Sequence, residues 1–128
     1  MPVWLEKNEI RYFHGELLRE HGGLPGLKDE GALESTLARP LNLLAYEADA
    51  TLFQLAASYG FGFARNHVFA DGNKRVALVA INVFLLINGF SLTAPEPAAV
   101  TLIRELAAGE LDEAGLAAWI KANSEPVR

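Results

Sequence analysis

The sequence of 128 residues contains no cysteine, which excludes disulfide bonds, thiolate metal sites and cysteine nucleophiles. Basic residues are outnumbered, because 11 Lys and Arg stand against 16 Asp and Glu and give a net charge of -5. This balance argues against non-specific binding of nucleic acids or anionic membranes over the whole surface, but it leaves room for a small basic site.

Long hydrophobic runs are also missing. The most apolar stretch, residues 76–87, contains Asn82 and is much shorter than the roughly 20 residues that a membrane-spanning helix needs. The N-terminal residues lack a basic region followed by an apolar stretch, so we expect no signal peptide and a cytoplasmic protein. The length predicts one domain, residues 1–128, that can bury a core without disulfides.

Apolar residues recur at helical spacing along almost the whole chain. A first helix is expected to end at Gly22 and Gly23, which open a loop rich in Gly and Pro at 22–27. The apolar positions of this helix are Ile10, Phe13 and Leu17. Asp29 is expected to cap a short second helix that stops before Pro40.

Two longer helices are predicted at about 50–66 and 73–87, and two more after Pro97 and Asp112. The helix at 73–87 is apolar on every face, so we expect it to be the central element of the core. A short extended piece is possible near 90–93. The fold class is therefore all-α, a compact bundle of about six helices around a buried central helix.

The loop between the two longest helices carries the candidate site. The helix start at 73 presents unpaired N–H groups and the positive end of the helix dipole, and Gly72 lets the backbone approach a ligand closely. Lys74 and Arg75 add two cations to the same turn, although the dipole repels each by about 0.3–1 kcal/mol. Three sources of positive potential at one place predict a bound polyanion, for which a nucleoside triphosphate is a natural candidate.

Three further side chains belong to this loop. His67 is suited to accept a proton from an attacking hydroxyl, since histidine titrates near neutral pH. Asp71 could hold Mg²⁺ through one carboxylate, with phosphate oxygens and water completing the octahedron. Phe69 is expected to anchor the loop in the core. A base, a carboxylate and a cationic helix start together suit phosphoryl-type transfer.

The same residues also allow a purely structural interpretation. His67 could cap the preceding helix, residues 71–73 could form a simple turn with an N-cap, and Lys74 and Arg75 could be a solvated edge. The residues taken alone leave both interpretations open.

Other polar residues receive no role from the sequence. His14 and His21, on or after the first helix, are interpreted as ordinary surface or capping histidines. Arg65 and Asn66 could touch a ligand, but capping of the helix end explains them equally well.

Residues 67–75, with the sequence HVFADGNKR, resemble the signature of the Fic/Doc (Fido) superfamily. They look most like the Doc branch, the death-on-curing toxins of bacterial toxin–antitoxin pairs. Residues 22–26, 29–40, 45–47 and 88–89 also look like Doc at similar spacing. The resemblance spans most of the chain and implies a compact helical Fic/Doc-type domain.

The resemblance implies a role for each residue of the motif. His67 would activate the target hydroxyl, and Asp71 would handle Mg²⁺ or the phosphates. Gly72 and Asn73 would form the anion-binding start of the helix, and Arg75 would contact the nucleotide phosphates.

Lys74 separates two activities within the superfamily. Enzymes that transfer AMP carry glycine at this position, whereas Doc carries lysine and is thought to bind the nucleotide the other way round, which delivers the γ-phosphate. The resemblance therefore implies an ATP-dependent protein kinase that acts on a translation factor, elongation factor Tu in the family, and arrests translation. Gly72 is more like the AMP-transferring members, so transfer of AMP is the alternative activity.

Two non-enzymatic functions are less compatible with the sequence. A catalytically silent module that binds only an antitoxin would fit a degraded motif, but residues 67–75 are intact. A helix-turn-helix regulator is disfavoured by the acidic charge and by the lack of an exposed recognition helix, so no direct nucleic-acid binding is expected.

The chain lacks an inhibitory motif of its own. Many Fic proteins carry Ser or Thr followed four residues later by Glu and then Gly or Asn. Here Glu30 is the only Glu followed by either residue, and Gly26 lies four positions before it. Inhibition is therefore expected from a separate antitoxin whose disordered tail folds onto a groove of this protein.

Overall fold

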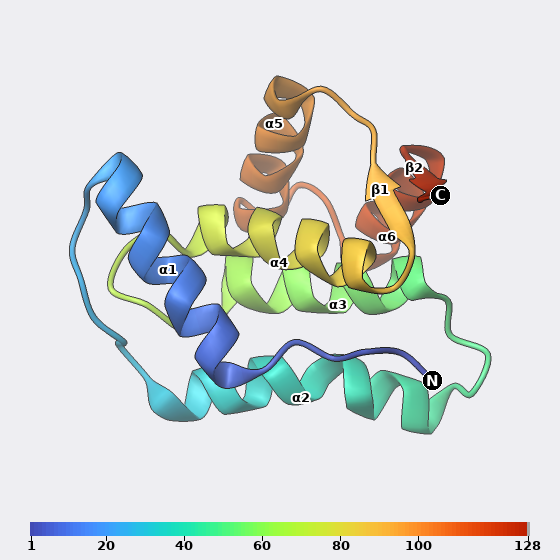
Figure 1. Cartoon of the computed structure of the whole chain (residues 1–128), viewed down its shortest axis with the longest axis horizontal. Coiled ribbons are helices and arrows are strands. Elements are labelled where there is room, and N and C mark those ends of the chain that lie inside the picture. Colours follow the sequence, from blue (N-terminus) through green and yellow to red (C-terminus); the bar gives the residue numbers. More distant parts are fainter. Residues whose placement is uncertain (128) are drawn as a thin grey trace.

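Helices form wherever the apolar spacing predicts them, in a computed structural model that describes residues 1–127. The elements are α1 (Lys7–His21), α2 (Glu30–Tyr46), α3 (Leu52–Arg65), α4 (Asn73–Ile87), β1 (Phe90–Leu92), α5 (Glu96–Ala107), α6 (Glu113–Ala122) and β2 (Ser124–Pro126). Within the described residues, 65% of which are helical, the two strands form the only sheet, a small antiparallel pair. The expected all-α class and the number of helices are confirmed (Figure 1).

Local capping explains where several helices begin. The side chains of Asp29 and Asp112 each accept a hydrogen bond from the backbone N–H three residues further on, at the starts of α2 and α6. Thr51 and Gln54 form a capping box at the start of α3. Each such cap contributes about 1 kcal/mol by pairing an N–H group that the helix itself leaves unsatisfied.

The second helix is longer than the sequence predicts. The sequence predicts that it stops before Pro40, but α2 continues through this residue to Tyr46. Proline lacks an N–H group, so the helix loses the bond to the carbonyl of Thr36. Pro40 is buried, and beyond it Leu43 and Leu44 pack against the core. Burial of these side chains offsets the lost hydrogen bond, so the helix continues beyond Pro40.

The most buried helix is α3, not the predicted helix at 73–87. It packs against α2, α4, α5 and α6, and in Figure 1 it runs alongside α4 with α2 on its other side. Eight of its 14 residues are buried, whereas α4 ends in the exposed side chains of Leu86 and Ile87. Small residues let neighbouring helices approach α3 closely, and these are Ala56, Ala57, Ser58, Gly60 and Gly62. The apolar sequence of a helix was therefore not enough to identify the central helix of the core. How closely neighbouring helices can approach also depends on the size of the side chains between them.

Gly60 provides a test of this packing. A Cβ atom at this position would lie 2.5 Å from Cδ1 of Ile81 and 3.3 Å from Cδ2 of Leu116, both in the core. We expect Gly60→Ala to destabilise the protein, because overpacking costs about 1–3 kcal/mol and exceeds the helix-propensity gain of roughly 1 kcal/mol. Gly15→Ala is the matched control, since nothing lies within 4 Å of its Cβ position, and it should stabilise by about 0.5–1 kcal/mol. Urea denaturation of both variants measures the difference, and a Gly60→Ala protein at least as stable as wild type would contradict this packing.

The short sheet joins the C-terminal strand to the end of α4. The extended piece expected near 90–93 is present as β1, which pairs with β2 so that Ser91 lies opposite Glu125. Strand β2 is not predictable from the sequence, because strands of three residues carry too little alternation to be recognised.

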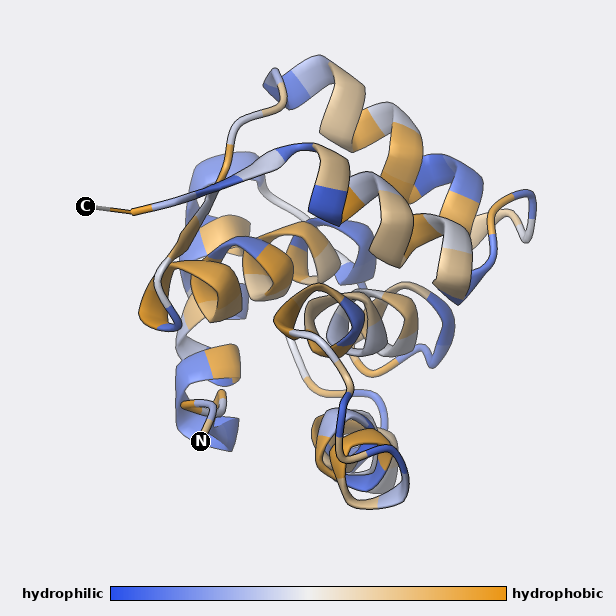
Figure 2. Cartoon of the chain, turned by 90° about the vertical axis from the view of Figure 1, so that its right-hand side faces the viewer, coloured by the Kyte–Doolittle hydropathy of each residue, from blue (hydrophilic) through white to orange (hydrophobic). Residues whose placement is uncertain are grey.

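Figure 2 shows hydrophobic and hydrophilic residues sharing most helices, as expected for amphipathic helices that bury one side. Within residues 1–127, no helix combines the length and the hydropathy needed to cross a bilayer.

Candidate phosphate-binding site

The loop that carries the predicted site residues, residues 66–72, joins the end of α3 to the start of α4. Its first residue is fixed, because the Asn66 side-chain N–H donates to the hydroxyl of Thr36 at 2.9 Å. Thr36 is buried in α2, so the loop leaves the core at a defined point. Asn66 therefore has a structural partner, which accounts for its presence beside His67.

His67, the second residue of this loop, is exposed. Its φ angle of 50° puts it in the left-handed region, where it is the only non-glycine among the described residues. Histidine is one of the few residues enriched there. Within residues 1–127, no protein group forms a hydrogen bond with its imidazole. The residue is exposed, and no protein group among the described residues occupies either ring nitrogen.

Phe69 and Asn73 close the loop onto the helix start. Phe69 is buried, with 3% of its surface exposed. The Asn73 side chain accepts a hydrogen bond from the Phe69 N–H and donates one to the Phe69 carbonyl, both at 2.9 Å. Because both ends of the Asn73 amide are occupied, this residue can offer a ligand its backbone N–H rather than its side chain.

The carboxylate of Asp71, near the end of the loop, is held in place by two backbone N–H groups. Its Oδ2 accepts from the N–H of Leu24 at 3.2 Å, and its Oδ1 accepts from the N–H of Gly72 at 2.8 Å. These two backbone donors hold the pKa of Asp71 below its ordinary value of 3.8, and the nearby charge of Arg75 lowers it further. Asp71 is consequently an exposed anion at neutral pH.

The start of α4 is open and positive. Gly72 takes the N-cap position with a φ of 82°, and no side chain within the described residues caps the helix. Lys74 and Arg75 are exposed, and neither forms an ion pair within residues 1–127. The helix start thus combines free N–H groups, the positive end of the helix dipole and two unpaired cations. This arrangement is typical of sites that bind phosphate groups.

A divalent cation fits this site only together with a ligand. The described residues contain no cluster of three or more His, Asp or Glu that could hold a metal ion. The single ionised carboxylate of Asp71 beside an anion-binding helix start is the donor set expected for Mg²⁺, which usually takes one or two carboxylates with substrate phosphates and water.

A second loop, residues 22–29, pairs with the site loop. Leu27 forms an isolated antiparallel bridge with Phe69, and the N–H groups of residues 28 and 29 both donate to the Val68 carbonyl. Gly23 has a φ of 120°, and a Cβ atom there would lie 2.7 Å from Oδ2 of Asp71. The Gly- and Pro-rich loop expected from the sequence therefore lies directly beside Asp71.

A family model described as the Fic/DOC family matches residues 4–85, which include α1, α2, α3, both loops of the site and all but the last two residues of α4. The chain belongs to the Fic/Doc family. Two curated relatives were found. "Protein kinase doc" of Escherichia phage P1 is 35% identical over 114 residues, covering 88% of this chain and 89% of the relative. "Toxin Doc" of Mycolicibacterium smegmatis is 39% identical over 101 residues, covering 76% of this chain and 77% of the relative.

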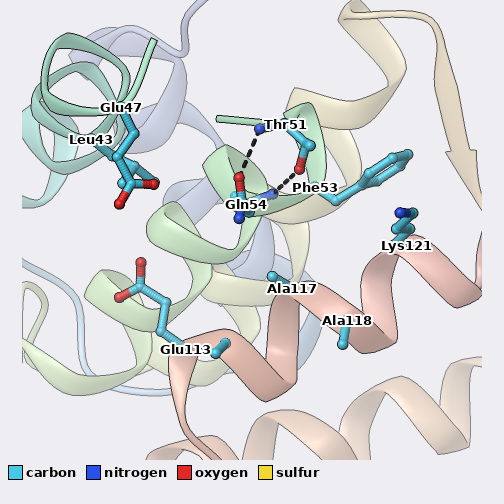
Figure 3. Close-up of a pocket in the computed structure, with 10 residues that line it drawn as sticks. Leu43, Glu47, Thr51, Phe53, Gln54, Glu113, Ala117, Ala118 and Lys121 are labelled. Atoms are coloured by element: carbon cyan, nitrogen blue, oxygen red, sulfur yellow. Dashed lines mark hydrogen bonds between the residues drawn. The ribbon is translucent and has the colours of Figure 1, made fainter. Parts of the chain in front are cut away.

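This Fic/Doc chain also has a groove away from the phosphate-binding loop. The groove has a volume of about 430 Å³ and lies between α2, α3 and α6 (Figure 3). Leu43, Phe53 and Ala117 supply apolar lining, with Glu113 and Lys121 among its charged residues. The groove is lined by the first turn of α3, whereas the site loop follows the last turn of the same helix. The groove is therefore separate from the candidate phosphate site.

One residue that packs against the site loop, His14, has no role predicted from the sequence. Its position favours a surface or capping histidine, but only 5% of its surface is exposed. Its Nε2 lies 2.8 Å from the carbonyl oxygen of Asp71, and its ring stacks on Phe69. The available signal was its place between Ile10 and Leu17 on the apolar face of the first helix.

The lowered pKa of Asp71 predicts a pH dependence of stability. A carboxyl whose pKa is lower in the folded state stabilises the fold above its unfolded pKa and loses this contribution as the pH falls. Wild-type protein should therefore lose stability as the pH falls below about 3.8 towards the folded pKa of Asp71. Asp71→Asn has no charge to lose, so its free energy of unfolding should fall less over this range when measured by urea denaturation. Parallel pH profiles for the two proteins would contradict the assignment.

Proposed function

We propose that this chain is the toxin of a toxin–antitoxin pair and acts as a Doc-type protein kinase. It would transfer the γ-phosphate of ATP to a hydroxyl group of a translation factor similar to elongation factor Tu. Family membership and the names of the two relatives support the toxin role and the class of reaction. The observation that carries the proposal is the meeting of an open helix start, two cations, one carboxylate and an accessible histidine in a single loop.

Nucleotide binding would rest on the start of α4. Its free N–H groups and the side chains of Lys74 and Arg75 would hold the phosphate oxygens. Asp71 would hold Mg²⁺, which when bound would neutralise negative charge on the phosphates. The pairing of Asp71 with the N–H groups of Leu24 and Gly72 keeps its carboxylate in place for that task.

His67 would act as the general base. In the transfer, the hydroxyl oxygen of the target forms a bond to the γ-phosphorus, while the bond from that phosphorus to the bridging oxygen breaks and ADP leaves. The proton of the hydroxyl passes to an imidazole nitrogen of His67. Exposure of this ring supports the role, because a protein substrate must reach it.

Lys74 supports γ-phosphate transfer over other outcomes. It occupies the second residue of α4 and is exposed beside the N-terminal N–H groups. A lysine there adds positive charge for a terminal phosphate, and its bulk prevents the close backbone approach that a glycine would allow.

A separate antitoxin would control the activity. The chain has no inhibitory motif of its own, and both relatives belong to the Doc group, one of them named as a toxin. A disordered antitoxin tail that folds on binding is the partner class we propose.

Expression in a bacterial host tests the proposed toxin role. We expect induction of the wild-type chain to stop growth and the incorporation of labelled amino acid into protein, and co-expression of its antitoxin to restore both. The His67→Ala chain should leave growth unaffected at the same protein level. Growth arrest that is equally strong with His67→Ala would point instead to a catalytically silent binding module.

Transfer of AMP is the second candidate, and Gly72 is the observation in its favour. Its left-handed backbone allows a ligand to approach the helix start closely. ATP labelled at the α-phosphate decides between the two reactions, since only AMP transfer would carry this label to the target. We expect no α-label on the target, and labelled target would establish the alternative.

A further inference from the structure

One buried polar side chain outside the motif, on α1, contacts the site loop at two residues. The imidazole of His14, on α1, stacks on the ring of Phe69 with centroids 3.8 Å apart and an interplanar angle of 11°. Its Nε2 lies 2.8 Å from the carbonyl oxygen of Asp71. A Cβ atom on Gly72 would lie 3.6 Å from the same ring. A single side chain thus contacts two of the four residues that lead into α4, Phe69 and Asp71, and lies close to a third, Gly72.

The hydrogen bond fixes which nitrogen carries a proton. A carbonyl oxygen can only accept, so Nε2 of His14 must be the donor to Asp71. Both the neutral Nε2–H form and the imidazolium supply this donor. The contact therefore holds the loop in either charge state.

This bond also determines the direction of a functional N–H group. A trans peptide points its carbonyl oxygen and its N–H to opposite sides. When His14 holds the carbonyl of Asp71, the N–H of Gly72 must point the other way, where it donates to the Asp71 carboxylate at 2.8 Å. If this peptide turned over, the carboxylate would lose that donor and the helix start would change shape.

We propose that His14 is a positioning residue of the phosphotransfer site: its Nε2–H orients the Asp71–Gly72 peptide, and its ring supports Phe69. The inference rests on the proposed kinase function. His14 touches neither nucleotide nor target, and it acts by setting the geometry of the Asp71 carboxylate and of the first N–H groups of α4.

Two substitutions of His14 separate the effect of its hydrogen bond to Asp71 from the effect of its stacking on Phe69. His14→Phe keeps an aromatic ring against Phe69 but removes the donor. His14→Gln removes the ring but can place an amide N–H close to the position of Nε2. His21→Phe is the matched control, because His21 lies on the same helix with 42% of its side chain exposed. Ile120→Val, in the core of α6, is the control for lost stability alone.

Transfer kinetics and melting temperatures are measured for all four variants with elongation factor Tu and ATP. We expect His14→Phe to lower kcat about 10- to 100-fold at saturating ATP, in the range seen when groups that orient catalytic residues are removed. His14→Gln should recover most of that loss, and His21→Phe should match wild type. Ile120→Val should keep its kcat even if its melting temperature falls as far as that of His14→Phe. An unchanged kcat in His14→Phe, or no recovery in His14→Gln, would overturn the proposal.

A second readout separates this inference from the proposed function. The backbone amide signals of Gly72 and Lys74 are followed by nuclear magnetic resonance without nucleotide. We expect His14→Phe to shift both signals, and His14→Gln to return them towards wild type. If the wild-type chain transfers no phosphate but these shifts occur, the kinase proposal fails while the positioning role stands. If the signals do not move, the positioning role is wrong whatever the activity.

Discussion

Replacing His67 by alanine is expected to lower the initial rate of phosphate transfer about 100- to 10,000-fold, the range that a positioned general base contributes. The imidazole is exposed and has no hydrogen-bond partner within residues 1–127, so little of the fold depends on it. The effect should therefore appear mainly in kcat, and the melting temperature should fall only by the small cost of an alanine with left-handed backbone. Initial rates at saturating ATP measure it.

A second variant is needed because the backbone of His67 is left-handed. Its φ of 50° is uncommon for alanine but well tolerated by asparagine. His67→Asn should keep the loop conformation and still lose the rate, whereas His21→Ala on the exposed end of α1 should have no effect. If His67→Asn retained most of the wild-type rate, the general-base role would be wrong.

Replacing Arg75 by alanine is expected to reduce kcat/KM for ATP about 10- to 100-fold. A hydrogen bond between charged groups is worth roughly 1.5–3 kcal/mol, and the charge of Arg75 is close enough to the site to lower the pKa of Asp71. The change should appear mainly as a higher KM for ATP, since the proposed contact of Arg75 with the phosphates would exist both before and during transfer. Steady-state kinetics over a range of ATP concentrations measure it.

Arg19 provides the matched control for this charge. It lies on α1 with 80% of its side chain exposed, in a loose pair with Glu16 at 3.6 Å. Arg19→Ala should leave the KM for ATP unchanged, because an exposed pair of this kind contributes little. Equal effects of the two substitutions would mean that only the overall charge matters, and the phosphate contact of Arg75 would be excluded.

Local signals in the sequence were sufficient for the helix starts and for the site loop. Asp29 and Asp112 cap the helices that they were expected to begin, because capping depends on residues three positions apart. The loop at 67–75 stood out for the same reason, since the glycine, the cations and the helix start are neighbours in the chain. Chemistry of this type can be recognised from sequence because it is concentrated in a few consecutive residues.

Contacts between distant segments were not predictable in the same way. The pairing of Leu27 with Phe69 joins segments about 40 residues apart, and nothing in either segment specifies its partner. Pro40 was expected to end a helix, because its local cost is visible in the sequence whereas the burial that offsets it is not. His14 belongs to the same class, since its partners lie on another part of the chain.

The mass of elongation factor Tu after incubation with this chain, Mg²⁺ and ATP tests the central claim most directly. The account predicts that the factor gains the mass of one phosphoryl group, and that the gain disappears with His67→Asn. A gain equal to AMP would contradict γ-phosphate transfer and favour the alternative reaction. An unchanged mass with a folded, ATP-binding chain would contradict elongation factor Tu as the substrate.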